Sequence, residues 1–359
     1  MSMFIKEKVN LFLCFSFVVV VVFLSASSSL AKKIEISIGS YDPPLDLSLS
    51  KTNGNFASTN VKAQIFKKIV EGKSNGRISV KIFPNGQLGG DREAFEMVKL
   101  GSLQASAYPG NMLSAFVPEV TVLDIPYLFK DANVAFKVLE GDFGAEMADI
   151  VLKKTGVRII QWGIDGPYEN IFTKKKQVKV PSDLKGIKIR VANNPPYVAA
   201  IKFAGGSPVP IDWAEVYTSL QQGVIDGLVT GLPYAADIKA EEIVKYVTIA
   251  KPYCALSSFF FNESFFQSLS EDDKQLILEA GHKAMRVYSG LQLWGAELWA
   301  EYYESKGLTV YHPTPAEMQK WESSIKEPMI KWVEEKVGKE WIVKLQKAVE
   351  KAEQELYSD

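Results

Sequence analysis

The chain has 359 residues, of which 47% are hydrophobic and 23% are charged, and its formal net charge at pH 7 is -1. This length predicts two domains of ordinary size. The near-neutral charge balance excludes the basic surface with which proteins bind the phosphates of nucleic acids, so no nucleic-acid partner is expected. With only two cysteines, Cys14 and Cys254, the chain cannot build a disulfide framework and must depend on a large core.

The N-terminus has the three parts of a secretory signal peptide. Lys6 and Lys8 carry positive charge, residues 11–24 form an apolar run, and Ser29-Leu30-Ala31 fits the small-x-small cleavage pattern. The apolar run is shorter than the roughly 20 residues that a membrane-spanning helix needs, which disfavours an uncleaved anchor. We therefore expect residues 1–31 to be removed and the mature protein to be periplasmic.

The first half of the mature chain alternates between strand and helix patterns. Residues 34–38 alternate apolar with polar side chains, residues 61–70 repeat apolar side chains at helical spacing, and residues 78–82 alternate again. Such a strand–helix–strand unit is the building block of a parallel sheet covered by helices. Further along, the pattern predicts a helix over residues 132–154 and a strand over residues 157–162.

Glycine and proline at residues 163–167 mark a change, after which a second set of elements begins. Residues 187–191 alternate as a strand, and residues 196–204 form a helical pattern that ends at two glycines. Asp212 is a favourable N-cap for the following helix, and Glu215 three residues later predicts a capping box.

A long helical pattern covers residues 271–306, and Ser270 is its predicted N-cap. Its glycines, Gly281, Gly290 and Gly295, are expected to break or bend the helix. Helices of this length in two-domain α/β proteins often connect the domains.

Arg190 is the most informative residue for function. It lies near the end of the strand predicted over residues 187–191, and in open α/β sheets ligands bind at the carboxyl ends of the strands. The planar guanidinium group offers paired donors that match a carboxylate. The alternative is an exposed arginine that pairs with a surface acid, and the strand pattern alone leaves both interpretations open.

Several motifs occur in the order found in one protein family. They are the FPNGQLGGDRE segment at residues 83–93, FVPE at 116–119, DIPYLF at 124–129, DLKGIKIRV at 183–191, PVP at 208–210 and EVYTSLQQGVIDG at 215–227. Together they closely resemble the substrate-binding subunits of tripartite ATP-independent periplasmic (TRAP) transporters, the DctP-like C4-dicarboxylate-binding family. The resemblance covers nearly the whole mature chain.

This resemblance implies an α/β, two-domain periplasmic binding protein of the type II-like kind, with hinge strands, a long domain-spanning helix and a ligand cleft between the domains. We expect residues 32–164 with about 256–290 to form the first domain. Residues 165–255 with about 291–359 are expected to form the second.

The resemblance also implies the residues that contact the ligand. It places the salt bridge to a ligand carboxylate at Arg190 and an aromatic side chain against the ligand at Trp213. Thr230 falls where sialate-binding members carry an asparagine. Asn193, one short loop beyond Arg190, is expected to donate a hydrogen bond to the ligand.

This sequence departs from the family where many members carry a second arginine in a Gly-x-Arg context. The corresponding segment reads Gly166-Pro167-Tyr168-Glu169-Asn170, without an arginine. From this segment we expect Tyr168 and Asn170 to contribute to the site. Tyr234 is expected as a further aromatic contact, and Tyr41 as part of a long loop that shapes the mouth of the cleft.

The missing arginine predicts the class of ligand. A second carboxylate left without a cation in a closed cleft would bear a desolvation cost of several kcal/mol. We therefore expect a monocarboxylate, such as a 2-oxo or 2-hydroxy acid, a sugar acid or an aromatic acid, rather than a simple C4 diacid. The expected protein partners are the membrane permease subunits of a TRAP transporter.

Other classes of function find less support in the sequence. His282 and His312 have no second histidine or cysteine at metal-ligand spacing, so neither a metal nor another cofactor is expected. Glu215 could approach a bound cation, but no second ligand motif accompanies it. A secreted enzyme with a catalytic carboxylate pair would need two acids facing one cleft, and the spacing reveals no such pair. We expect a binding protein that is not an enzyme, with a stand-alone sensor module as a further alternative.

Overall fold

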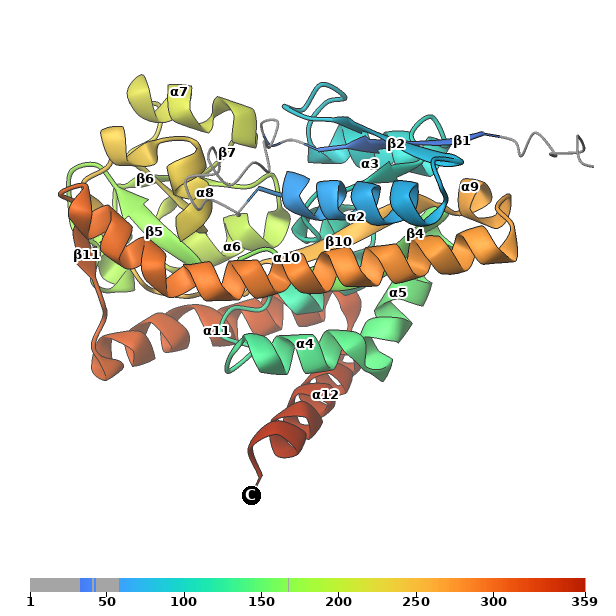
Figure 1. The fold of residues 1–359 in the computed structure, drawn as a ribbon. Helices are drawn as coiled ribbons and strands as arrows, with labels where there is room; N and C mark the ends of the chain where they lie inside the picture. The colour runs from blue at the N-terminus through green and yellow to red at the C-terminus, as the bar shows by residue number, and fades with distance from the viewer. Residues whose placement is uncertain (1–32, 41, 43–57, 167, 359) are drawn as a thin grey trace, which may run out of the picture.

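The computed structural model describes residues 33–40, 42, 58–166 and 168–358, so the predicted signal peptide and Tyr41 lie outside the described part. The strands form two separate sheets, each covered by helices, and one long helix connects the two halves (Figure 1). The prediction of a two-domain α/β binding protein is confirmed.

The first sheet has five strands in the order β2-β1-β3-β10-β4. Strands β1, β2 and β3 are parallel, whereas β10 runs antiparallel to both of its neighbours, β3 and β4. The bounds are β1 (Ile34–Gly39), β2 (Ile78–Phe83), β3 (Ala105–Ser106), β4 (Val157–Ile164) and β10 (Leu256–Asn262).

Helices cover both faces of this sheet. They are α2 (Asn60–Lys73), α3 (Asp91–Leu100), α4 (Ala132–Glu140), α5 (Asp142–Thr155) and α9 (Glu263–Gln267), with the 3₁₀ helices η1 (Asn111–Ala115) and η2 (Pro118–Asp124). The single helix predicted over residues 132–154 is in fact two helices, because the backbone of Gly141 is extended between them. The turn is so tight that a Cβ on Gly144 would lie 1.9 Å from the carbonyl oxygen of Leu139.

The second sheet has six strands in the order β11-β9-β5-β8-β6-β7. Strand β5 is antiparallel to β8 and β9, and β6 is parallel to β7 and β8. The strands are β5 (Glu169–Thr173), β6 (Lys188–Val191), β7 (Ser207–Pro210), β8 (Gly227–Gly231), β9 (Tyr246–Thr248) and β11 (Thr309–Tyr311). The helical segments around them are η3 (Pro181–Leu184), α6 (Pro195–Phe203), η4 (Trp213–Glu215), α7 (Val216–Gln221), α8 (Leu232–Asp237) and η5 (Ala240–Glu242).

The helix predicted to begin after Asp212 starts differently from the expectation. A 3₁₀ turn, η4, precedes α7, and the Asp212 side chain caps neither of them. Its Oδ1 accepts a hydrogen bond from the Asn193 side chain instead. The predicted capping box with Glu215 is therefore wrong. The Asp212 carboxylate binds Asn193 in the loop after β6 instead of the backbone amides of the helix.

Helix α10 (Glu271–Ser305) spans the molecule from the first sheet to the second (Figure 1). It contacts α2 and β4 in its first half and α8 and β11 in its second. Ser270 caps it as predicted, by accepting a hydrogen bond from the Asp273 amide. The expected breaks are absent from this helix, since residues 271–305 form one unbroken element. Its glycine at 281 serves close packing, because a Cβ there would lie 2.4 Å from Ile160 Cγ2.

Three connections join the sheets: β4 to β5, β9 to β10, and α10. The first two run side by side and are hydrogen-bonded to each other. The Asp165 amide donates to the Ala255 carbonyl over 2.7 Å, and the Glu169 amide to the Tyr253 carbonyl over 3.0 Å. We call these paired segments the hinge.

The C-terminal helices α11 (Pro315–Val337) and α12 (Lys339–Tyr357) diverge. Helix α11 contacts α6 beside the second sheet, whereas α12 contacts α4 and α5 beside the first. The assignment of all residues from 291 to 359 to the second domain therefore does not describe α12. Its buried residues Trp341, Ile342 and Leu345 lie on the side of the helix that packs inward.

Candidate functional site

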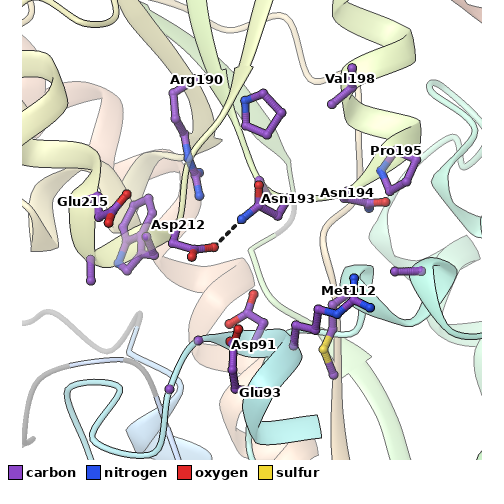
Figure 2. A pocket seen from close by; sticks show the side chains of 18 of the residues that line it. Asp91, Glu93, Met112, Arg190, Asn193, Asn194, Pro195, Val198, Asp212 and Glu215 are labelled. Atoms are coloured by element: carbon purple, nitrogen blue, oxygen red, sulfur yellow. Dashed lines mark hydrogen bonds between the residues drawn. The ribbon is translucent and has the colours of Figure 1, made fainter. Parts of the chain in front are cut away.

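A cleft of about 900 Å³ lies between the two halves of the molecule. One wall comes from residues 85–93 and from η1 beside the first sheet. The other comes from the loop after β6, from α6 and from η4 (Figure 2). A smaller cavity of about 60 Å³, the inner chamber, shares Asp91, Arg190, Ala192 and Trp213 with the cleft and forms its inner end.

Arg190 lies on β6 and points into the cleft (Figure 2). The residue is 6% exposed. Its Nε donates to the Ile211 carbonyl over 2.9 Å, and its guanidinium carbon lies 5.3 Å from the centre of the Trp213 ring. The side chain is thus held from one edge and one face, which orients the guanidinium group for a planar acceptor such as a carboxylate.

Trp213 and Tyr234 complete one side of the inner chamber. Their rings meet edge to face with centres 6.1 Å apart. The Tyr234 hydroxyl donates to Asp165 Oδ1 over 2.7 Å and lies 2.6 Å from the Tyr288 hydroxyl. Thr230 also lines the chamber and is buried. The structure therefore brings four of the predicted site residues together, namely Arg190, Trp213, Thr230 and Tyr234.

Asn193 lines the outer cleft rather than the inner chamber. Its side chain is exposed, and its amide group donates a hydrogen bond to the Asp212 carboxylate (Figure 2). A ligand in the cleft would meet this amide only on the side that Asp212 leaves open.

The structure does not bring Tyr168 and Asn170 to Arg190. Both line a second cavity of about 580 Å³, together with Leu232 and Lys251. Glu169, which lies between these two residues, lines the inner chamber. The expectation that Tyr168 and Asn170 share a site with Arg190 is corrected accordingly, and Tyr41 lies outside the described residues.

Three acids that the sequence did not single out line the inner chamber: Asp91, Asp165 and Glu169. Burial raises the pKa of Asp91 to about 7, although Arg190 opposes the shift. Burial likewise raises the pKa of Glu169 to about 7, opposed by Arg190 and by a hydrogen bond from Tyr197. The pKa of Asp165 is raised by burial too. Of these three acids, only Asp91 lies in one of the family motifs, the one at residues 83–93.

Lys62 is a second buried cation near the site, but it lies behind the chamber. It is fully buried on α2, and its ammonium group donates to Ser257 Oγ over 2.5 Å and to the Ser258 carbonyl over 3.3 Å. Burial lowers the pKa of Lys62 to about 8, against the attraction of Asp165. Because the Lys62 ammonium group donates to these internal acceptors, it stabilises the structure around the site.

The outer cleft has further charges. Arg92 and Lys202 line it and are exposed, as are the acids Glu93, Asp212 and Glu215. Within the described part of the chain, Arg190 is the one cation that lines the inner chamber.

In the ranges that the structure covers, no group of three or more histidine, cysteine or acidic side chains is arranged to hold a metal ion. Over the same ranges, no helix has the length and apolar character to cross a membrane.

Comparison with known proteins places the chain in a family. The model of the bacterial extracellular solute-binding protein family 7, DctP, matches residues 51–336. A solute-binding protein of Verminephrobacter eiseniae is 33% identical over 227 residues, which are 63% of this chain and 67% of that protein.

Two solved structures show the same fold. The sugar acid binding protein DctPAm of Advenella mimigardefordensis, in complex with galactonate, is 25% identical with a TM-score of 0.81 and covers 89% of this chain and 99% of its own. A TRAP periplasmic solute-binding protein of Sulfurospirillum deleyianum, with bound succinate, is 25% identical with a TM-score of 0.77 and covers 88% of this chain and 98% of its own.

The molecule has two α/β halves, a hinge of two paired segments and a deep cleft with an anchored arginine. These features define a solute-binding protein. The chain belongs to family 7 of the bacterial extracellular solute-binding proteins, and its structural relatives include periplasmic solute-binding proteins of TRAP transporters. The resemblance inferred from the motifs is therefore confirmed.

Proposed function

We propose that this protein captures a small organic acid in the periplasm, with the ligand carboxylate bound to Arg190, and delivers it to a TRAP-type membrane permease. The observation that carries this proposal is the buried guanidinium group at the inner end of the cleft, fixed by the Ile211 carbonyl and the Trp213 ring. Residues 1–31, as a signal peptide, would direct export of the chain to that compartment and then be removed.

The charges of the chamber favour an acid with a single carboxylate there. Arg190 faces Asp91, Asp165 and Glu169, so any second anionic group at this depth would meet acids instead of a cation. An uncompensated buried charge costs several kcal/mol. Among the structural relatives, one has bound galactonate, a monoacid rich in hydroxyl groups, and another has succinate, a diacid. We propose that the ligand here belongs with the first kind.

Catalysis by a carboxylate pair is the alternative from another class. Asp91 and Glu169 do line the same chamber, and both have a raised pKa. Both acids also act on the same guanidinium group, which leaves no free acid and base on opposite sides of a substrate. We propose binding without turnover, so the acid released from denatured protein should be chemically unchanged.

The test begins with protein purified in its native state, from which the bound acid is released by denaturation and identified by mass spectrometry. Calorimetry with that acid then compares the wild type with Arg190→Ala. Breaking a buried ion pair costs about 3–5 kcal/mol, so we expect affinity to fall at least about a hundredfold in a variant whose circular dichroism spectrum shows that it still folds. Arg286→Ala, which removes an exposed arginine of α10, is the matched control. Near-normal affinity in Arg190→Ala would refute the assignment.

A further inference from the structure

Glu169 is a buried acid that faces the inner chamber. It is the first residue of β5 and is 9% exposed. It lines the inner chamber together with Arg190. Among the described residues, its Oε2 has no hydrogen-bond partner.

A buried carboxylate oxygen without a donor is costly, so such an atom calls for a partner. The groups around it are Arg190, Tyr197 and Asp165, of which Tyr197 already hydrogen-bonds to the carboxyl group. The chamber beside it has a volume of about 60 Å³, which admits only the acid end of a ligand. A donor on the ligand close to its carboxylate would satisfy this oxygen.

We propose that Glu169 determines ligand specificity by accepting a hydrogen bond from a hydroxyl group on the carbon next to the ligand carboxylate. A 2-hydroxy acid supplies this donor. A 2-oxo acid places a carbonyl oxygen there, and two acceptors facing each other lose the hydrogen bond and repel. The inference rests on the proposed function, because Arg190 must hold the carboxylate for the neighbouring carbon to face Glu169.

The experiment compares acids that differ only at this carbon. Calorimetry measures the dissociation constants of lactate and pyruvate, of 2-hydroxybutyrate and 2-oxobutyrate, and of galactonate and its 2-oxo analogue. For the wild type we expect each hydroxy acid that binds to do so at least about tenfold more tightly than its oxo partner, as befits a hydrogen bond to a charged acceptor.

Glu169→Gln is the decisive variant, because it keeps the size of the side chain, removes its charge and adds an NH₂ donor. In this variant the dissociation constants of each hydroxy acid and its oxo partner should differ by no more than about threefold, mainly because the oxo acid binds more tightly. Glu279→Gln, an exposed glutamate paired with Lys73 and Lys283, is the matched control and should leave the preference unchanged.

A second measurement uses the wild type alone, in case the variant folds poorly. Since the pKa of Glu169 is raised to about 7, the carboxyl group is protonated at about pH 5.5 and can donate, so the preference should narrow there relative to about pH 8. The other titratable or charged groups coupled to Glu169 are Arg190, Asp165, Tyr197, Tyr253 and Asp124. Where Glu169→Gln does fold, the same comparison in that variant separates the effect of these groups from that of Glu169.

A Glu169→Gln protein that keeps the wild-type preference overturns this inference, and so does a wild type that favours the oxo acids. In either case Arg190→Ala still loses binding if the proposed function holds. Should the wild type bind no carboxylate at all, the proposed function fails as well.

Discussion

Several buried carboxyl groups in this protein keep their protons to a higher pH than they would in the unfolded chain. Burial raises the pKa of Asp42 to about 6, that of Glu169 to about 7 and that of Asp124 to about 8. Each pKa lies above the ordinary pKa of the group. At pH values between the ordinary and the raised pKa, the folded state therefore binds more protons than the unfolded state. Stability therefore falls as the pH rises through this interval.

Asp124 should show this effect most clearly. Asn194 and Ser114 hydrogen-bond to its carboxyl group, and its Oδ2 has no partner among the described residues. We expect the melting temperature to fall as the pH rises from about 5 to about 7.5, and to fall less steeply in Asp124→Asn, which cannot ionise. Asp149→Asn on the exposed side of α5 is the control. Parallel pH profiles for wild type and Asp124→Asn would contradict the assignment.

The sequence predicted the residues of the site only where one local pattern was sufficient. Arg190 was expected because it lies near the end of a strand and within a family motif, and Trp213 was expected from the family resemblance alone. Asp165 and Glu169 could not, since their place beside Arg190 depends on how the hinge pairs in three dimensions. Asn170 lines a different cavity from Arg190 although it is paired with Thr230 of the chamber, and the sequence pattern alone could not separate the two cavities.

At the level of elements, strand alternation predicted β1, β2, β4 and β6, and helical spacing predicted α2 and the long α10. The errors arose where tertiary contacts decide the outcome. Asp212 looked like an N-cap, but its carboxylate binds Asn193. The amphipathic α12 could have packed on either domain, and its contact with α4 and α5 is not encoded in its own periodicity.

Two glycines of α10 test the packing of this helix. Gly281 is buried and a Cβ would lie 2.4 Å from Ile160 Cγ2, whereas Gly290 is exposed and a Cβ would meet nothing within 4 Å. We expect Gly281→Ala to lower the free energy of unfolding by about 1–3 kcal/mol through overpacking. Gly290→Ala should raise it by about 0.5–1 kcal/mol through helix propensity.

Denaturant unfolding of both variants measures these changes. Equal effects of the two substitutions would mean that α10 does not lie against β4 as closely as the structure has it.

At the scale of the whole molecule, polar contacts link the halves behind the cleft. Asp165 follows β4 in the hinge, and its Oδ1 accepts hydrogen bonds from Tyr234 of α8 and Tyr288 of α10. The two halves are thus connected at one side and open at the other, an arrangement suited to hinge closure around a ligand. Closure requires that the ligand contact both halves, since only differential contacts shift such an equilibrium.

Small-angle X-ray scattering of the protein with and without its acid ligand tests the central claim most directly, namely capture of a carboxylate between the two halves at Arg190. Galactonate and succinate, each at saturating concentration, are the first probes. We predict that an acid bound with measurable affinity reduces the radius of gyration of the wild type, and that the same acid at the same concentration leaves Arg190→Ala unchanged. An acid that binds the wild type tightly without altering its radius of gyration, or that compacts Arg190→Ala equally, would contradict the account.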